Sequence, residues 1–176
     1  KKEGGLFYAS SGNGSIQHIA GELLSRQAKQ PMTHVPYKGS GPAINDLIAG
    51  NVDMFITTPP SVIGHFAGGR IKPLAYTGSK RHPSMPDVPT SAEAGLPGYE
   101  FATWFGIVAP KGTPAPVIAK LVKHIHAMQD DPEIQRKLAD GGLEALKETP
   151  EQFGARMRRD NDRFRDIVKA AKLKPE

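Results

Sequence analysis

The first 77 residues repeat one arrangement three times: a short apolar segment, a turn rich in Gly, Ser or Pro, and a segment with helical spacing. Strands are predicted at residues 6–10, 33–37 and 52–57, and a fourth at 71–77. Strands that alternate with helices in this way predict an α/β fold with a doubly wound, mostly parallel sheet and right-handed crossovers. Ligands of such sheets bind beyond the carboxyl ends of the strands, at the N-termini of the helices.

The helices between these strands are bounded by turn residues. The first should end before Pro31, and its apolar face is formed by Ile16, Ile19, Ala20, Leu23 and Leu24. In the second helix Pro42 is expected as the first residue, and Gly50 marks the end. A short third helix should end at Gly68-Gly69.

The second half of the chain predicts three amphipathic helices but few strands. Residues 101–110 predict a strand, residues 144–147 a shorter one, and the helices are expected near 117–125, 131–140 and 150–171. One or two strands are too few for an independent sheet, so these helices should cover a sheet supplied from elsewhere. The expected division is an α/β lobe at 1–100, with a Pro-rich hinge at 78–100, and a C-terminal segment at 101–176.

Composition excludes several classes of function. The chain has no cysteine, which removes disulfides, thiolate metal sites and cysteine nucleophiles. Of the formal net charge of +5, residues 1–80 carry +4, which favours an anionic partner. The sequence lacks the dense basic stripe with interleaved aromatic residues that is typical of nucleic-acid-binding proteins. No apolar run is long enough to cross a bilayer, and Lys1-Lys2-Glu3 is not followed by the apolar segment of a signal peptide.

Two Gly- and Ser-rich turns are the candidate ligand sites. The first turn (residues 10–15) and the second turn (residues 37–41) each precede a predicted helix, and the strand-end position Thr57 opens a third. Amide N–H groups at a helix N-terminus are unpaired donors in a positive dipole, which suits a carboxylate or phosphate. Tight βα connections that only cap a helix would have the same composition. Because both turns follow neighbouring strands, we predict that they lie side by side.

Sequence signatures of catalysis are absent. No P-loop pattern occurs, and Gly12-Asn13-Gly14 is followed by Gln17 where a dinucleotide-binding fingerprint needs Gly. Gly39-Ser40-Gly41 is not a nucleophile elbow. The six histidines form no ligand set, and His18 is expected on a polar face, paired with Glu22. We therefore predict no catalytic residues, no metal and no cofactor.

The turn sequences resemble the Bug family, the receptor subunits of tripartite tricarboxylate transporters. Order and spacing match over nearly all 176 residues. The resemblance is carried by residues 8–15 with His18 and Glu22, residues 35–43 with Asp46-Leu47, residues 86–90 with 93–98, Trp104-Phe105-Gly106, Ala109-Pro110 and Gly112-Thr113-Pro114.

The resemblance implies a periplasmic binding protein of type II, whose two α/β lobes close on a small carboxylate. Main-chain amides and bridging waters hold the ligand in this family, and membrane transporter subunits are transient partners. The chain would supply one lobe and a C-terminal helical segment that returns to the other. By position, the ligand-binding residues would be Ser10, Ser11, Gly12, Asn13, Gly14, Ser15, Tyr37, Lys38, Gly39, Ser40, Gly41 and Thr57.

Two departures from the family pattern shape the expectations. The usual Trp-Pro start and Pro-Gly-Gly loop have no counterpart, so half of the usual cleft is expected to be missing and a homodimer through the C-terminal segment is expected to cover the apolar faces. Thr57 stands where many relatives carry Asp, which argues against recognition of an amino group. A truncated relative that acts as an interaction module and a doubly wound α/β enzyme acting on a small anionic substrate remain as alternatives.

Overall fold

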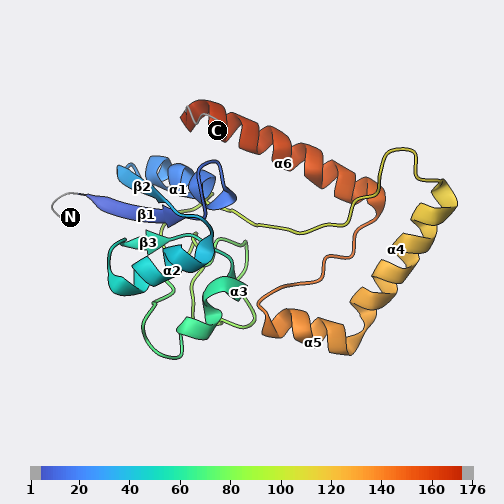
Figure 1. Cartoon of the computed structure of the whole chain (residues 1–176), viewed down its shortest axis with the longest axis horizontal. Helices are drawn as coiled ribbons and strands as arrows, with labels where there is room; N and C mark the ends of the chain where they lie inside the picture. Colours follow the sequence, from blue (N-terminus) through green and yellow to red (C-terminus); the bar gives the residue numbers. More distant parts are fainter. Residues whose placement is uncertain (1–4, 172–176) are drawn as a thin grey trace.

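The computed structural model describes residues 5–171 of the chain. Three parallel strands, β1 (Leu6–Ser10), β2 (Met32–Pro36) and β3 (Met54–Phe55), form a sheet in the order β2-β1-β3. The helices between them are α1 (Ile16–Gln27) and α2 (Ser40–Ala49), and α3 (Pro59–Val62) with the 3-10 turn η1 (Ile63–His65) follows β3. The predicted α/β class and strand–helix alternation are confirmed (Figure 1).

Alternation along β1 places the two crossover helices on opposite faces of the sheet. Ala9 packs with Ala43 of α2 and Val52, whereas Tyr8 faces α1, where a Cβ on Gly21 would come within 2.1 Å of the Tyr8 ring. Successive side chains of a strand point to opposite faces, which makes this arrangement doubly wound. Tyr8, Ala9 and Ser10 are all completely buried, so β1 is the centre of the lobe.

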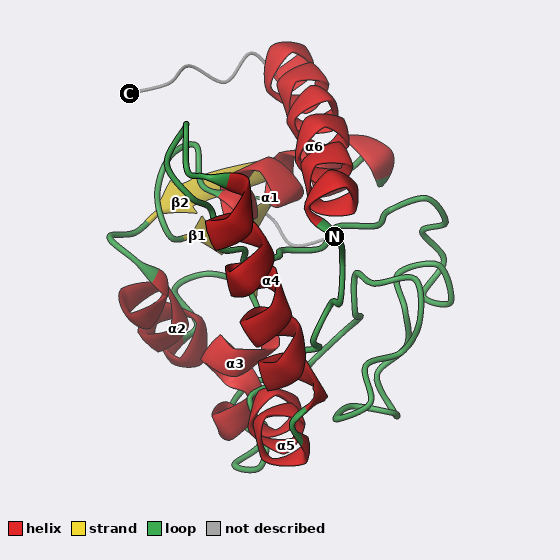
Figure 2. Ribbon diagram, turned by 90° about the vertical axis from the view of Figure 1, so that its right-hand side faces the viewer, coloured by secondary structure: helices red, strands yellow, loops and turns green. Residues whose placement is uncertain are grey.

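The C-terminal segment forms an arm of three helices, as predicted: α4 (Ala115–Asp130), α5 (Pro132–Asp140) and α6 (Pro150–Ala171). The C-terminal part of α6 returns to α1, where Phe164, Ile167 and Val168 pack on Ile19, Ala20 and Phe101. Figure 1 shows α4 and α5 at the opposite end of the molecule from the sheet, and in Figure 2, seen from that end, they lie in front of the lobe. No helix of the described part is both long and apolar enough to span a membrane.

Three predicted strands are wrong. Around 71–77, only Tyr76 forms a bridge, to Thr90 in the Pro-rich connection. The N–H of Tyr76 donates to Pro89 and its carbonyl accepts from Ser91, so both of its backbone groups are bound to that connection. At 101–110, Phe101 donates its N–H to Thr77, but residues 102–109 have no strand beside them among the described residues. At 144–147, side chains of α4 bind the main chain instead, for example Gln129 at Leu146.

Two element boundaries also differ from the prediction. The third strand is shorter than residues 52–57, because the N–H of Phe7 donates to the carboxylate of Asp53 rather than to a backbone carbonyl. Helix α2 begins at Ser40, so Pro42 is its third residue and not its first. Gly39 precedes the helix with a φ of 100°, a left-handed conformation that few other residues adopt easily.

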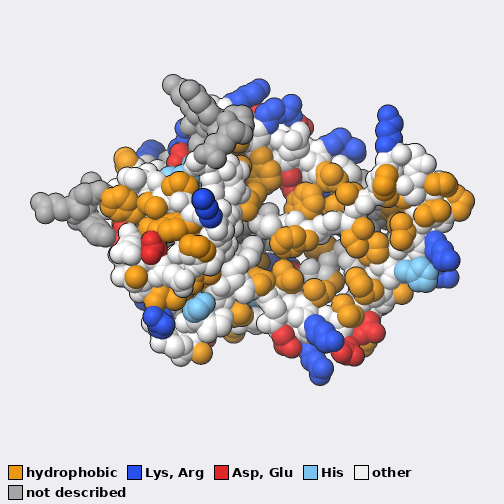
Figure 3. Space-filling view, viewed as in Figure 1, with side chains coloured by type: hydrophobic (Ala, Val, Ile, Leu, Met, Phe, Trp, Pro, Cys, Tyr) orange, Lys and Arg blue, Asp and Glu red, His pale blue; other side chains and the backbone are white. Residues whose placement is uncertain are grey.

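A central hollow of about 2070 Å³ separates the α/β lobe from the arm. It is bounded by residues 101–110, by the apolar faces of α4, α5 and α6, and by the lobe. Apolar side chains gather around it in the space-filling view (Figure 3). Phe105, Ile107 and Val108 are 78%, 69% and 71% exposed there, since nothing in the described structure covers them.

Candidate functional site

The strand order brings the predicted turns together. β1 is central, so the first turn (residues 10–15) is flanked by the second turn (residues 37–41) on one side and by Thr57 on the other. The N–H of Tyr37 donates to the carbonyl of Ser10 at 3.0 Å, and the N–H of Gly39 donates to that of Ser11 at 3.1 Å. The two turns therefore lie side by side at the carboxyl edge of the sheet, as predicted.

The first turn is held by its own hydrogen bonds. Gly12 and Gly14 have positive φ values of 147° and 70°. The N–H of Gly12 donates to Ser10 Oγ, and that of Gly14 donates to His18 Nδ1, each at 3.1 Å. Ser15 caps α1 by accepting the N–H of His18. The amides of Gly12 and Gly14, which the sequence suggested as ligand donors, are thus already engaged within the protein.

The second turn leaves donors open. No side chain caps α2, and the amides of Ser40 and Gly41 have no partner among residues 5–171. Lys38 is exposed and forms no ion pair with a described residue. The hydroxyl of Tyr37 is turned to α2, where it donates to Asp46 at 2.7 Å; burial and this bond raise the pKa of Tyr37 to about 12. The same bond lowers the pKa of Asp46.

Thr57 lies at the end of β3 with an unusual hydroxyl. Its Oγ1 is buried and has no hydrogen-bond partner in the described structure. A buried hydroxyl without a hydrogen-bond partner lowers the stability of the fold, so such groups commonly bind a ligand or a water. Thr57 and its neighbour Thr58 also line the central hollow.

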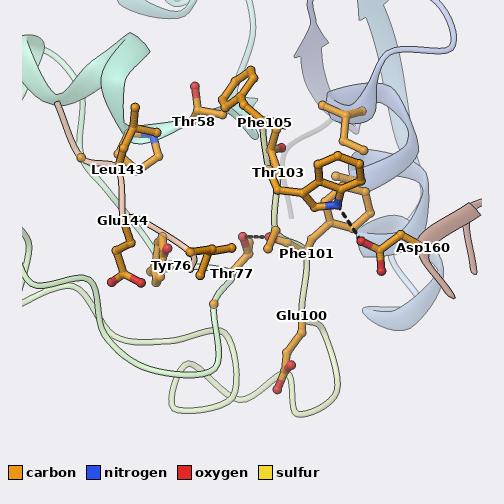
Figure 4. A pocket seen from close by; sticks show the side chains of 18 of the residues that line it. Thr58, Tyr76, Thr77, Glu100, Phe101, Thr103, Phe105, Leu143, Glu144 and Asp160 are labelled. Atoms are coloured by element: carbon orange, nitrogen blue, oxygen red, sulfur yellow. Dashed lines mark hydrogen bonds between the residues drawn. The ribbon is translucent and has the colours of Figure 1, made fainter. Parts of the chain in front are cut away.

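The central hollow is too large for a pocket that encloses one small ligand, because such pockets usually measure about 300–1,000 Å³. Figure 4 shows Thr58, Thr103 and Phe105 among its lining residues, together with Asp160, whose carboxylate accepts the indole N–H of Trp104 at 2.7 Å. The lining of the hollow includes Ile16, Gln17 and Thr57 but no residue of the two turns. The polar turn edge and the apolar hollow therefore adjoin but are not one site.

Behind the first turn lies a histidine pair that sequence reasoning missed. The rings of His18 and His34 stack with centroids 3.7 Å apart, and Tyr8 stacks on His34. The expectation of a surface His18 paired with Glu22 is wrong: His18 is 8% exposed, and Glu22 accepts the hydroxyl of Tyr8 instead. Helical spacing allowed the pairing with Glu22, but only the approach of β1 and β2 reveals the nearer partners.

Burial keeps this histidine pair neutral. It lowers the pKa of His34 to about 4, and the adjacent His18 adds to the effect. Burial also lowers the pKa of His18, although Glu22 opposes this. Protonation of either ring would place a charge in a stack from which water is largely excluded.

A serine and a histidine lie close enough to suggest nucleophilic chemistry. Ser10 Oγ is 2.7 Å from His34 Nε2. Ser10, however, is completely buried, and its hydroxyl proton is donated to the carbonyl of Gly12 at 2.9 Å. A nucleophile must reach its substrate, so this pair organises the turn. Among the described residues, no three His, Cys, Asp or Glu side chains could hold a metal ion.

Comparisons with known proteins place these features in a family. The family model described as tripartite tricarboxylate transporter family receptor matches residues 1–173. A UPF0065 protein from the tcbD-tcbE intergenic region of Pseudomonas sp. (strain P51) is 39% identical over 166 residues, which cover 94% of this chain and 49% of that protein.

Solved structures agree. The structure of R. palustris Rpa4515 with adipate is 36% identical, with a TM-score of 0.88 over 97% of this chain and 57% of that one. MatC from Rhodopseudomonas palustris with bound malate is 35% identical, with a TM-score of 0.77 over 93% and 56%. The chain thus spans about half the length of these relatives. It belongs to the tripartite tricarboxylate transporter receptor family and has the fold of its periplasmic binding proteins.

Proposed function

We propose that this chain forms part of a periplasmic solute receptor that binds a small carboxylate anion and does not transform it. The observation that carries the proposal is the uncapped N-terminus of α2 beside the first turn, where the amides of Ser40 and Gly41 have no partner in the described structure. Such amides, at the positive end of a helix dipole, favour a carboxylate. The adipate and malate in two similar structures support this ligand class.

Within that class, the neutral Thr57 favours acids that carry no amino group. An ammonium group buried near Thr57 would find a hydroxyl there and no carboxylate to balance its charge. The exposed Lys38 adds a positive charge beside the two turns. A plain dicarboxylate is therefore a better candidate than an amino acid.

The family description also suggests the setting of this activity. Membrane subunits of a tripartite tricarboxylate transporter would be the transient partners, and the periplasm would be the site of capture. Because the chain spans about half the length of its relatives, the whole protein's affinity, substrates and partners are part of this proposal.

The amide of Ser40 allows a direct test. Ser40→Pro removes one N–H at the first position of α2, where proline fits the helix and where the ψ of 172° at Gly39 suits a residue that precedes proline. Loss of a hydrogen bond from a backbone N–H to a carboxylate costs about 1.5–3 kcal/mol. The affinity for adipate in calorimetry should therefore fall about 10- to 150-fold. Ser40→Ala keeps the amide and removes only the hydroxyl, so its loss should be much smaller.

Calorimetry also separates the alternatives. Equal loss in Ser40→Pro and Ser40→Ala would show that the α2 amide does not bind the ligand. Tight binding of aspartate together with no binding of adipate would contradict the proposed ligand class. No binding of any acid by a folded, self-associated chain would favour an interaction module.

We further propose that a second copy of the chain covers the central hollow in solution. Residues 102–109 present an extended backbone without strand partners among the described residues, flanked by the exposed side chains of Phe105, Ile107 and Val108. Soluble proteins seldom leave apolar surfaces of this extent in water.

A further inference from the structure

The two glycines of the first turn are each held by one member of the stacked histidine pair. His18 Nδ1 accepts the N–H of Gly14 directly, at 3.1 Å. His34 acts through Ser10, whose Oγ is 2.7 Å from His34 Nε2 and accepts the N–H of Gly12. The ring centroids are 3.7 Å apart and the planes are tilted by 10°, so the two rings are packed face to face.

Counting protons assigns the tautomers. Ser10 has one hydroxyl proton, and the carbonyl of Gly12 takes it, so His34 Nε2 must carry a proton and donate it to Ser10 Oγ. His18 must have an unprotonated Nδ1, because only a bare nitrogen accepts an amide N–H. The hold on Gly14 therefore requires a neutral His18.

The ionisable groups around the pair come from three elements. Glu22 of α1 and Tyr8 of β1 are bonded to each other at 2.8 Å, and His34 lies on β2. Glu22 favours a charged His18, whereas burial and the stacked neighbour oppose it. The carboxylate of Glu22 is engaged with Tyr8, so a proton on His18 Nδ1 would face the N–H of Gly14, donor against donor.

We propose that His18 is a positioning residue of the first turn, which it holds in its binding shape only while its imidazole is neutral, so that acid loosens the turn and weakens carboxylate binding. This rests on the proposed carboxylate-binding function of the site. His18, which is only 8% exposed, would then set the pH range in which the turn is ordered.

Calorimetry with adipate at about pH 7.5 and about pH 5 tests the effect on binding. His18→Asn offers an amide oxygen near the place of Nδ1 and does not titrate, whereas His18→Leu removes the acceptor. The carboxyls of adipate also take up protons on acidification, but they do so equally for all variants. Loss of one neutral hydrogen bond corresponds to about three- to tenfold in affinity, so the wild type should lose that much more than His18→Asn on acidification. The exposed His124→Asn on α4 is the matched control and should follow the wild type.

NMR without ligand separates this inference from the proposed function. The amide resonance of Gly14 should shift along the titration curve of His18 in the wild type and in His124→Asn, and stay constant in His18→Asn. If no acid binds at any pH but this coupling is seen, the binding function fails and the positioning role stands. A Gly14 resonance that ignores the His18 titration, or equal pH profiles of affinity in the wild type and His18→Asn, would overturn the inference, even if His18→Leu does not fold.

Discussion

Thr57 combines a buried hydroxyl with the lack of a hydrogen-bond partner in the described structure. Thr57→Val replaces that hydroxyl with a methyl of similar size, and an unsatisfied buried group costs about 1–3 kcal/mol. We expect urea unfolding of the free protein to show equal or higher stability in the variant, while affinity for adipate falls. A clear loss of stability would show that the hydroxyl has a partner in solution. The neighbouring Thr58→Val is the control. Thr58 Oγ1 forms a hydrogen bond with Ser61 Oγ at 3.1 Å, so this variant should lose stability.

His34 makes the stability of the lobe depend on pH. In the unfolded chain a histidine takes up its proton near pH 6.5, but in the folded chain the pKa of His34 is lowered to about 4 by burial and by His18. Above both values neither state binds the proton; between them only the unfolded state does, so stability falls as pH falls from about 6.5 to about 4.

Substitution isolates this contribution. His34→Gln keeps a donor for Ser10 near the place of Nε2 but cannot titrate. Because the ring is partly exposed, we expect on the order of 1 kcal/mol less stability loss in this variant between about pH 7 and about pH 5. Denaturation midpoints at both pH values measure it. Parallel curves for the wild type and His34→Gln would be inconsistent with a lowered pKa of His34 in the folded chain.

Helix α1 and strand β1 approach so closely that Gly21 has no room for a side chain. A Cβ there would lie 2.1 Å from the ring of Tyr8, which is completely buried and also bonded to Glu22. Overpacking of this kind costs about 1–3 kcal/mol, and we expect that loss for Gly21→Ala in thermal or urea unfolding. Gly64→Ala is the matched control: its Cβ would meet nothing within 4 Å, so its stability should be unchanged or slightly raised.

Trp104, the only tryptophan of the chain, links residues 101–110 to helix α6. Its indole N–H donates to Asp160, and its ring meets Phe153 edge to face. Asp160→Ala leaves this donor without its partner, so we expect about 1–3 kcal/mol of destabilisation and a red-shifted tryptophan emission. Asp162→Ala, at an exposed position of the same helix, should leave the emission maximum in place. Similar spectra for both variants would argue against this link.

At the scale of the whole molecule, the central hollow decides how the chain behaves in solution. Apolar side chains of residues 101–110 and of α4 line it, with Leu121 and Met128 each more than 40% exposed. We expect light scattering at micromolar concentration to give a dimer, and Ile107→Lys to shift it towards monomer, because an interface of this kind must be apolar at its centre. A wild-type chain that stays monomeric would refute the proposed self-association.

The sequence alone determined the local features of this protein. Periodicity and turn residues placed β1, α5 and α6 to within a residue and predicted α1 and α4 with less exact ends, because apolar spacing, proline and glycine act over a few neighbours. Asp160 interrupts the apolar face of α6, and only the fold gives a reason for it, because it brings the indole N–H of Trp104 to the carboxylate.

Tertiary structure decided what distant segments do to one another. Residues 71–77, 101–110 and 144–147 have strand-like composition, yet strands need neighbours, and the described fold gives them none. The amides of Gly12 and Gly14 are taken by near neighbours in the sequence, Ser10 and His18. The turns at 10–15 and 37–41 are joined by long-range bonds, from the amides of Tyr37 and Gly39 to the carbonyls of Ser10 and Ser11. His18 and His34 lie 16 residues apart in the sequence, and only the pairing of β1 with β2 and the packing of α1 stacks them. Strand pairing and helix packing between distant residues are therefore what assemble this site from its local turns.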